Sequence, residues 1–260
     1  MNMDHFKMAI LLLVTLPAVA LARAPSSVDH SLFTSILKDR VQGGLVDYTA
    51  LLKDPRLDRY ITSLSQTDPD MLSMNDRLAF WINAYNAVTL RLIRDNYPVK
   101  SINDLHPGGG LAIATLLKKT VWDTYSLSIN GEKYTLNKIE HEILRPVFRD
   151  FRIHAAIVCA SISCPDLREE AYQGNRINEQ LDDQMKRFMA DTSKNRYDPE
   201  KRIFYLSKIF SWFKKDFTRG QRPLVSVLRP YLPARSAWMA AAGSVKIKYL
   251  PYDWSLNDRK

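Results

Sequence analysis

A long apolar segment in the first half of the chain constrains the fold more than any other feature. The residue pattern predicts a helix from about Asn75 to Asn96 that shows no polar face until its last turns. A helix that is apolar on all sides must lie in the centre of a protein, covered by other elements. The chain has 260 residues, 46% of them hydrophobic, so it can surround such a helix with one sizeable core. The apolar positions are Leu78, Phe80, Trp81, Ile82, Tyr85, Val88, Leu90, Leu92 and Ile93.

Two amide side chains, Asn83 and Asn86, lie one turn apart inside this helix. A buried amide without partners costs about 1 to 3 kcal/mol, so both must be hydrogen-bonded to something specific. They could tie down neighbouring backbone, which is the commoner use of a buried amide. They could also orient a catalytic side chain or bind a ligand, so both are candidate ligand-binding residues.

The remaining pattern predicts a predominantly helical α+β domain with a small sheet. The clearest local signal is Asn130-Gly131 between two alternating segments, which is typical of a β-hairpin with a type I′ turn. We expect a single globular domain over residues 23–260. Further expected elements are helices over 27–41 (capped by Ser27), 55–64, 111–118 and 177–191, a strand over 203–206, a Ser207-capped helix with Phe210, Phe213 and Phe217 on its core side, and a closing extended segment over 247–257.

Residues 1–22 have the plan of a secretory signal peptide. A short charged region ends at Lys7, an apolar run follows, and small residues mark a cleavage site after Ala20 or Ala22. At about 1.5 Å of helix rise per residue, the apolar run is too short to cross a bilayer core of about 30 Å. We therefore expect export to the periplasm or the medium, with no integral membrane span after cleavage. An uncleaved N-terminal anchor is the alternative, because the charged region carries a single lysine offset by Asp4.

The formal net charge of +9 is the same with or without residues 1–22. Lysine and arginine are scattered along the chain and form no basic run, which indicates a solvated basic surface. Export argues against a nucleic-acid partner. The ligand is expected to be a small molecule, a peptide or an anionic envelope polymer, and a membrane surface is also compatible with the charge.

A second helix is expected to follow the hairpin directly, starting at Asn137. At 100° per residue, Leu136, Ile139, Ile143 and Val147 would form its apolar stripe. Glu140 falls on the edge of that stripe, while His141 and Arg145 lie on the flank. A carboxylate that leans toward the core could complete a capping box with Asn137 as N-cap, or it could hold an imidazole.

Both cysteines of the chain, Cys159 and Cys164, follow a nearly continuous apolar run over residues 151–160 that predicts a buried central strand. A helix is expected to start at Pro165. In an exported protein the pair could form a structural disulfide. Alternatively, Cys159 could be a reactive thiolate at the end of the strand. In a regular strand His154 would point to the opposite face, so His141 is the better candidate for the base.

Other chemistries have little support in the sequence. The second histidine of the zinc-binding HExxH pattern is missing after His141-Glu142, so no metal site is expected. The chain contains no phosphate-binding loop, no dinucleotide fingerprint and no Gly-x-Ser-x-Gly nucleophile elbow. We therefore expect no cofactor.

Four segments resemble, in order, the motifs of the domain of unknown function 547 family, and the resemblance covers roughly residues 30–257. The family brings no agreed activity. Its plant members carry serine where this chain has Cys164 and no histidine at the place of His154. The resemblance therefore implies that Cys159, His141, Glu140 and Arg145 matter most. The four segments are residues 79–87, 136–146, 159–165 and 208–217.

Two functions follow as hypotheses. The first is a cysteine-dependent hydrolase or acyl transferase, with Cys159 as nucleophile, His141 as base and Arg145 as anion-binding group, and with Glu140 or an asparagine of the central helix as orienting group. The second is a non-catalytic periplasmic binding module in which Cys159 and Cys164 form a structural disulfide. A thiol–disulfide exchanger is a third reading, although the pair lacks C-x-x-C spacing. The enzyme hypothesis requires the imidazole and the sulfur to share one open cleft.

Overall fold

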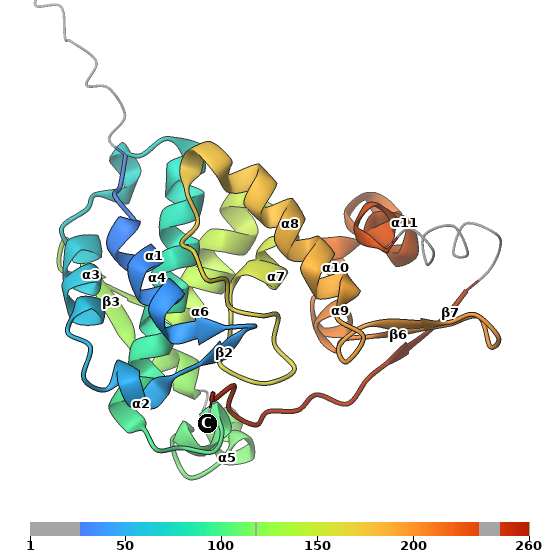
Figure 1. The fold of residues 1–260 in the computed structure, drawn as a ribbon, viewed down its shortest axis with the longest axis horizontal. Coiled ribbons are helices and arrows are strands. Elements are labelled where there is room, and N and C mark those ends of the chain that lie inside the picture. The colour runs from blue at the N-terminus through green and yellow to red at the C-terminus, as the bar shows by residue number, and fades with distance from the viewer. Residues whose placement is uncertain (1–26, 118, 234–244, 260) are drawn as a thin grey trace, which may run out of the picture.

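The computed structural model of the protein describes residues 27–117, 119–233 and 245–259, and the predicted signal peptide lies outside this part of the chain. The protein has an α+β fold dominated by helices (Figure 1). In chain order the elements are α1 (Ser31–Arg40), β1 (Val41–Gln42), β2 (Leu45–Val46), α2 (Tyr48–Leu51), α3 (Arg56–Ser65), η1 (Pro69–Met71), α4 (Met74–Asn96), η2 (Ile102–Leu105), α5 (Leu111–Leu116), η3 (Val121–Asp123), β3 (Ser126–Ile129), β4 (Glu132–Thr135), α6 (Leu136–Lys138), η4 (Ile139–Phe148), α7 (Ile153–Ala156), η5 (Gly174–Arg176), α8 (Ile177–Ala190), β5 (Arg196–Asp198), β6 (Ile203–Leu206), α9 (Ile209–Trp212), α10 (Lys214–Phe217), η6 (Arg219–Gln221), α11 (Leu224–Leu228), η7 (Arg229–Tyr231) and β7 (Lys246–Tyr249).

The central helix is confirmed. Every side chain of α4 from Leu78 to Leu90 is buried, and α1 and α3 lie on one side of it with α7 and α8 on the other (Figure 1). Ser73 caps its N-terminus, because the Ser73 hydroxyl accepts from the Asp76 amide at 3.2 Å. The N-terminal helix is confirmed, but it starts at Ser31, so the prediction that Ser27 caps it was wrong.

The hairpin is also confirmed. Strands β3 and β4 pair in antiparallel register, and Asn130 and Gly131 both have positive φ (50° and 81°), as a type I′ turn requires. The helix that follows differs from the prediction. Its N-cap is Thr135, whose hydroxyl accepts from the Lys138 amide, so the capping box of Asn137 and Glu140 was wrong.

Most of this helix, η4, is a π-helix. Hydrogen bonds from i to i+5 widen the turn, so each residue rotates less than the 100° assumed for an α-helix. The predicted apolar stripe therefore drifts along the helix. Ile139 and Leu144 are buried, whereas Val147 is 44% exposed. The same drift places Glu140 fully on the inner side, where it is 9% exposed.

The predicted central strand over residues 151–160 was wrong. Ile153–Ala156 form one turn of helix, α7, and the chain then runs extended to Cys159. Burial on all sides produces a continuous apolar run in either conformation, so periodicity could not distinguish them. No helix starts at Pro165 either, since residues 165–170 are irregular.

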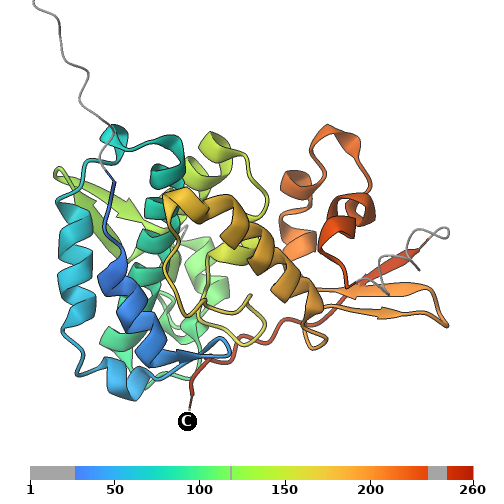
Figure 2. The same cartoon turned by 45° about the horizontal axis from the view of Figure 1, so that its top comes forward.

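A second apolar cluster lies beside the first, around α8 and the three-stranded sheet. Strands β5 and β6 are antiparallel and β7 is parallel to β6, and this sheet projects away from the body around α4 (Figure 2). The predicted helix after Ser207 is split into α9 and α10. Phe210 and Phe217 are buried in this cluster, as expected of core residues.

The C-terminal segment returns from the sheet to the body as an extended chain, which confirms the predicted closing segment (Figures 1 and 2). It pairs with distant backbone through bridges from Leu256 to Ser161 and from Ser255 to Ser101. The segment therefore closes over the turn that carries both cysteines. Within the described ranges, no helix combines the length and the apolar character needed to cross a bilayer.

Candidate functional site

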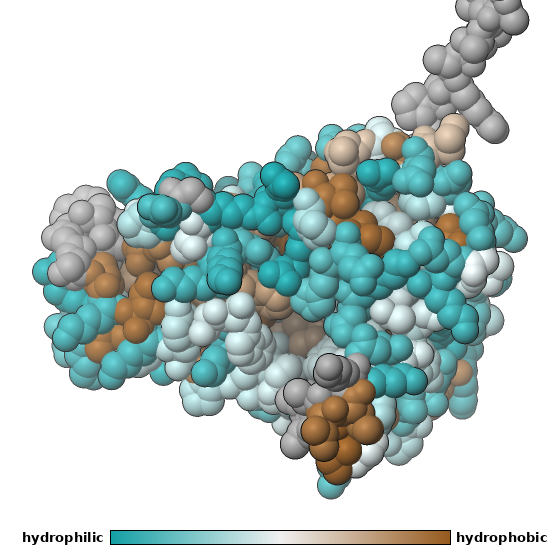
Figure 3. All heavy atoms as spheres, turned by 180° about the vertical axis from the view of Figure 1, so that it is seen from behind, coloured by the Kyte–Doolittle hydropathy of each residue, from teal (hydrophilic) through white to brown (hydrophobic). Residues whose placement is uncertain are grey.

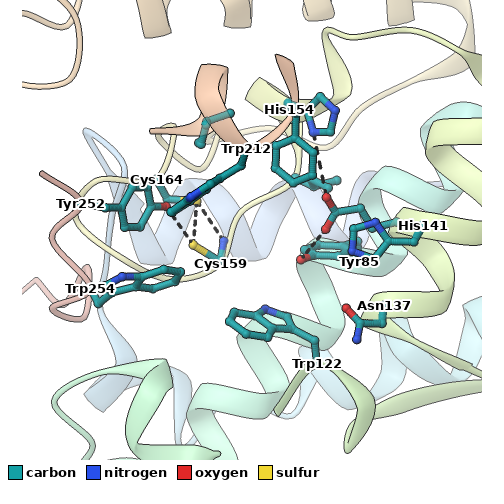
Figure 4. A pocket seen from close by; sticks show the side chains of 14 residues that line it. Tyr85, Trp122, Asn137, His141, His154, Cys159, Cys164, Trp212, Tyr252 and Trp254 are labelled. Carbon is teal, nitrogen blue, oxygen red and sulfur yellow. Dashed lines mark hydrogen bonds and ion pairs between the residues drawn. The ribbon is translucent and has the colours of Figure 1, made fainter. Parts of the chain in front are cut away.

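A pocket of about 210 Å³ lies where α4, the π-helix, the cysteine turn, α9 and the C-terminal segment meet (Figure 4). Its floor and walls come from parts of the chain that are far apart in sequence. The lining residues are Tyr85, Trp122, Asn137, Glu140, His141, His154, Ile157, Cys159, Cys164, Ile209, Trp212, Phe213, Tyr252 and Trp254.

The cysteine turn brings the two sulfurs to 3.1 Å, and both thiols are free, so the structure contains no disulfide. Cys159 is partly exposed and Cys164 is buried. The turn requires Ala160 to adopt a left-handed conformation with φ of 59°. A residue with a Cβ rarely adopts this conformation, and such strain is often found at functional sites.

Hydrogen-bond donors surround the sulfur of Cys159. The Ser161 hydroxyl lies 3.0 Å from it. The Tyr252 hydroxyl lies 3.2 Å from it, and Figure 4 shows this side chain beside Cys159. Hydrogen bonding from Cys164 lowers the pKa of Cys159 to about 6, with further help from these hydroxyls and against the effect of burial. Burial, together with the neighbouring Cys159, raises the pKa of Cys164 well above its ordinary value. Cys159 is therefore the thiolate of the pair at neutral pH, and Cys164 is the thiol.

Glu140 faces the same pocket from the π-helix. Burial raises the pKa of its carboxyl to about 7, although Arg145 opposes the shift. The hydroxyl of Tyr85 donates to Oε2 at 3.5 Å, and Nδ1 of His154 lies 4.0 Å from Oε1. At neutral pH the carboxyl can thus both donate and accept a proton.

His154 is held from its other ring nitrogen. Nε2 lies 2.8 Å from Oδ2 of Asp216, and the ring stacks on Phe213 with centroids 3.9 Å apart. The hydrogen bond from His154 is the largest of the effects that hold the pKa of Asp216 well below its usual range, so this carboxylate accepts and Nε2 carries the proton. The buried Nδ1 has no hydrogen-bond partner among the described residues and faces Glu140.

His141 lies at the exposed side of the pocket and is tied to Arg145. A guanidinium N–H donates to Nδ1 of His141 at 2.8 Å. Since arginine can only donate, Nδ1 carries the lone pair, and the neutral ring has its proton on Nε2. Burial, followed by the charge of Arg145, lowers the pKa of His141. This imidazole is therefore a hydrogen-bond donor at Nε2 near neutral pH, and Arg145 occupies the lone pair that a general base would use.

Arg145 does not line the pocket. Its Nε donates to Oδ2 of Asp216 at 2.6 Å, and its guanidinium lies 5.1 Å above the ring of Phe213. Both ends of the side chain are engaged within the protein. Its observed contacts hold His141 and Asp216.

Aromatic side chains surround the cysteine. Tyr252 packs against Trp254 and Trp212 at centroid distances of 4.5 Å and 4.8 Å, and Trp122 lies 6.2 Å from Trp254 (Figure 4). Trp212 is 48% exposed. These rings give the pocket an apolar wall that can hold a flat or aliphatic group. Seen from behind, the surface also shows an apolar projection at α5, where Ile113, Leu116 and the following Leu117 are exposed (Figure 3).

The two asparagines of α4 lie beneath the site and bind backbone. Asn83 donates to the carbonyl of Tyr172 and accepts from its amide. Asn86 donates to the carbonyl of Ala156 and accepts from the amide of Val158. Neither side chain lines the pocket. Their contacts correspond to the structural role considered from the sequence, and Asn86 fixes the chain just before Cys159.

The structure thus brings Cys159, His141 and Glu140 to one pocket, as predicted. Sequence reasoning missed His154 as the partner of Glu140, and it missed Asp216 and the aromatic wall. The alternating Tyr252 and Trp254 were a weak sign of a side-by-side aromatic face in the tail. Among the described residues, no three His, Cys, Asp or Glu side chains cluster as they would around a metal ion.

The family comparison agrees with the resemblance seen in the sequence motifs. The family described as "Protein of unknown function, DUF547" matches residues 69–189, which include α4, the π-helix and both cysteines. Searches of curated proteins and of solved structures gave no match. Over residues 69–189, the chain is therefore similar to the DUF547 family.

Proposed function

We propose that this pocket is the active site of a cysteine-dependent hydrolase or acyl transferase acting on an acyl or amide substrate. One observation carries the proposal: a thiol with a lowered pKa and a carboxyl with a raised pKa line the same aromatic-walled pocket. Divergent pKa values in one site are a common sign of a nucleophile and an acid–base group.

Cys159 would act as the nucleophile without a contacting base. At neutral pH its sulfur is already largely ionised, because Cys164, Ser161 and Tyr252 stabilise the thiolate. Attack on the substrate carbonyl would form a thioester and release the alcohol or amine. Water or an acceptor hydroxyl or amine would then attack the thioester and regenerate the thiolate.

Glu140 would move the proton. Its raised pKa allows it to protonate the leaving group in the first step and to accept a proton from the incoming water or acceptor in the second. Asp216 would hold His154 in place beside the Glu140 carboxyl. The neutral His141 would donate a hydrogen bond from Nε2 to the substrate.

We further propose that the protein acts in the periplasm or outside the cell after removal of residues 1–22. The support is the sequence pattern of a charged start, an apolar run and small residues before the cut. Sequencing the N-terminus of the protein from the envelope fraction tests this, since cleavage would give a chain that starts at Leu21 or Arg23. An intact Met1 in that fraction would contradict it.

The test of the enzyme proposal is to trap the acyl intermediate. Reduced protein would be mixed with an activated ester and quenched in acid, and its intact mass would be measured by mass spectrometry. We expect a thioester on wild type and on Leu52→Ala, an exposed site outside the pocket, and no adduct on Cys159→Ser. Glu140→Gln should accumulate the thioester and slow turnover by about 10²- to 10⁴-fold. Absence of any adduct on reduced wild type, across ester and amide electrophiles, would refute the enzyme proposal.

A non-catalytic binding module is the second candidate, and the aromatic wall favours it. Three tryptophans and two tyrosines line the pocket, and none of the histidines in the described ranges lies within hydrogen-bond distance of the Cys159 sulfur. In that case the reduced protein would bind ligands with tryptophan quenching, and Cys159→Ser would bind equally well. The trapped thioester separates the two candidates, because binding alone leaves the sulfur unmodified.

A further inference from the structure

The two sulfurs are arranged for a reaction with each other as well as with a substrate. They lie 3.1 Å apart with no bond between them, and a disulfide needs about 2.05 Å. The short turn already holds the geometry, since the amide of Cys164 donates to the carbonyl of Ser161 at 3.0 Å. The sulfurs need to approach each other by only about 1 Å for the bond to form.

The two cysteines differ in access. Both sulfurs border the pocket, but Cys159 is partly exposed, whereas Cys164 is buried with 5% exposure. The amide of Cys159 donates to the sulfur of Cys164 at 3.0 Å, which keeps that sulfur aimed at its neighbour. A small oxidant entering the pocket meets Cys159 first, and any product on that sulfur lies next to a thiol.

We propose that Cys159 is a site of reversible oxidation by hydroperoxides, with Cys164 as the resolving thiol that closes a disulfide. The oxidation requires the arrangement around the two cysteines and does not require the catalytic function proposed above. Its consequence, that the closed pair silences catalysis, rests on the function proposed above.

The first step is an attack of the Cys159 thiolate on the outer oxygen of the hydroperoxide. An S–O bond forms, the O–O bond breaks, and the alkoxide or hydroxide takes a proton to leave as an alcohol or water. The Tyr252 and Ser161 hydroxyls next to the sulfur can supply that proton and recover it from solvent. Burial keeps the pKa of Tyr252 well above its usual value, so its proton is in place at neutral pH. Cys159 is then a sulfenic acid, oxidised by two electrons, and the peroxide is reduced by two.

In the second step the sulfur of Cys164 attacks the sulfur of Cys159. The S–S bond forms, the S–O bond breaks, and the hydroxide leaves with the Cys164 proton as water. Conversion of Cys159 to the neutral sulfenic acid removes the charge that helped to keep Cys164 protonated. A dithiol reductant reverses the reaction by thiol–disulfide exchange and returns both cysteines to the free state.

The closed pair would protect the nucleophile. Without Cys164, the sulfenic acid in the pocket would meet a second peroxide and go on to the irreversible sulfinic acid. With Cys164, oxidation stops at a reversible product. An exported enzyme that meets oxidants would therefore lose activity under oxidation and recover it on reduction.

The experiment treats the reduced full protein anaerobically with an equimolar amount of hydrogen peroxide. Remaining thiols are blocked with N-ethylmaleimide, and the protein is weighed intact and mapped by peptides. We expect wild type to lose two hydrogen atoms, to take up no maleimide and to yield a Cys159–Cys164 linked peptide. Dithiothreitol should restore both maleimide sites. Cys159→Ser should keep Cys164 reduced, and Cys164→Ser should give a sulfenic acid that dimedone traps.

The wild-type peptide map needs no variant, so poor folding of a variant cannot hide the result. Recovery of Cys159 as sulfinic acid with Cys164 still open to maleimide would overturn the proposal, as would unreacted cysteines under peroxide. If the two cysteines form a disulfide but no thioester ever forms, the acyl-transfer proposal is refuted and the oxidation proposal is supported. If a thioester forms but the two sulfurs never form a disulfide, the oxidation proposal is refuted and the acyl-transfer proposal is supported.

Discussion

His154 donates a hydrogen bond from Nε2 to Oδ2 of Asp216 at 2.8 Å, across 62 positions of sequence. The same carboxylate oxygen accepts from Nε of Arg145 at 2.6 Å. Asp216 thereby joins α10 to the π-helix and to α7, and it fixes the histidine whose other nitrogen faces Glu140. One carboxylate thus holds His154 directly and, through Arg145, the ring of His141.

Replacing this carboxylate should destabilise the fold. Asp216→Asn leaves the buried His154 and the partly exposed Arg145 with a weaker partner, and we expect the free energy of unfolding to fall by about 3 kcal/mol. Because the folded pKa of Asp216 is lowered, its contribution is present above the unfolded pKa of about 3.9 and is lost as the pH falls through the folded pKa. Urea unfolding at neutral pH measures the loss. The matched control is Asp198→Asn, an edge carboxylate paired with exposed Lys201, which should change stability by less than about 1 kcal/mol. Equal losses in both variants would contradict the role given to Asp216.

Glu140 should make stability depend on pH in the opposite direction. Its pKa is about 7 in the folded protein and 4.5 when unperturbed, so the folded state binds more protons between these values. Stability should therefore fall as the pH rises through this window, by at most about 3 kcal/mol once the pH exceeds about 8. Glu140→Gln keeps the shape without the charge, so it should gain stability relative to wild type over the same window. Parallel pH curves for the two proteins would show that Glu140 titrates normally.

The reactivity of Cys159 should depend on its neighbour at 164. Alkylation by iodoacetamide should rise with a midpoint near pH 6 in wild type, the pKa of Cys159. Cys164→Ala removes the largest stabilising hydrogen bond, so the midpoint should rise toward the ordinary value of about 8.5. Cys164→Ser retains a donor and should lie between them. A midpoint that stays the same in all three proteins would assign the shift to another group.

Local signals in the sequence predicted the parts of the fold that local chemistry decides. Asn130-Gly131 specifies its turn through two positive φ values, and the apolar surface of α4 allows only a central position. The run over residues 151–160 was different. Its burial comes from contacts on all sides, and burial alone favours neither strand nor helix.

The site was harder to predict because its geometry is long-range. The i to i+5 hydrogen bonds of the π-helix move Glu140 inward, and no side-chain pattern in the sequence predicted them. Tyr252 reaches the pocket from the tail, and Asp216 binds the pocket residue His154 from α10; neither has a local signature. Cys159, His141 and Glu140 could be named because each is a chemically unusual residue in its segment, but their partners could not.

The left-handed Ala160 should limit what the cysteine turn tolerates. Its φ is 59° and its side chain is buried, so a β-branched residue there meets both a forbidden conformation and a filled core. Ala160→Val should lower the free energy of unfolding by about 2 to 4 kcal/mol and shift the alkylation midpoint of Cys159. Ala160→Gly is the matched control. Glycine adopts a positive φ without steric cost, but the substitution also removes a buried methyl group. Because these effects oppose each other, the free energy of unfolding should change by less than about 1 kcal/mol. A well-tolerated valine would show that the turn can relax.

Substitutions of the two asparagines of α4 distinguish an effect on stability from an effect on the reactivity of Cys159. Asn86 binds the backbone at Ala156 and Val158, directly before Cys159, whereas Asn83 binds the backbone at Tyr172. Each substitution to alanine leaves a buried carbonyl and amide unpaired, so both should lower the free energy of unfolding by about 2 to 3 kcal/mol.

Only Asn86→Ala should also disturb the nucleophile, because it frees the backbone that positions the Cys159 sulfur against Cys164. Its alkylation midpoint should rise and its peroxide-induced disulfide should form more slowly, while Asn83→Ala keeps both at wild-type values. Stability is read from urea unfolding and reactivity from labelling below the unfolding transition, so the two effects are measured separately. If both variants altered the thiol to the same extent, the reactivity of Cys159 would depend on the stability of α4 as a whole and not on the hydrogen bonds of Asn86.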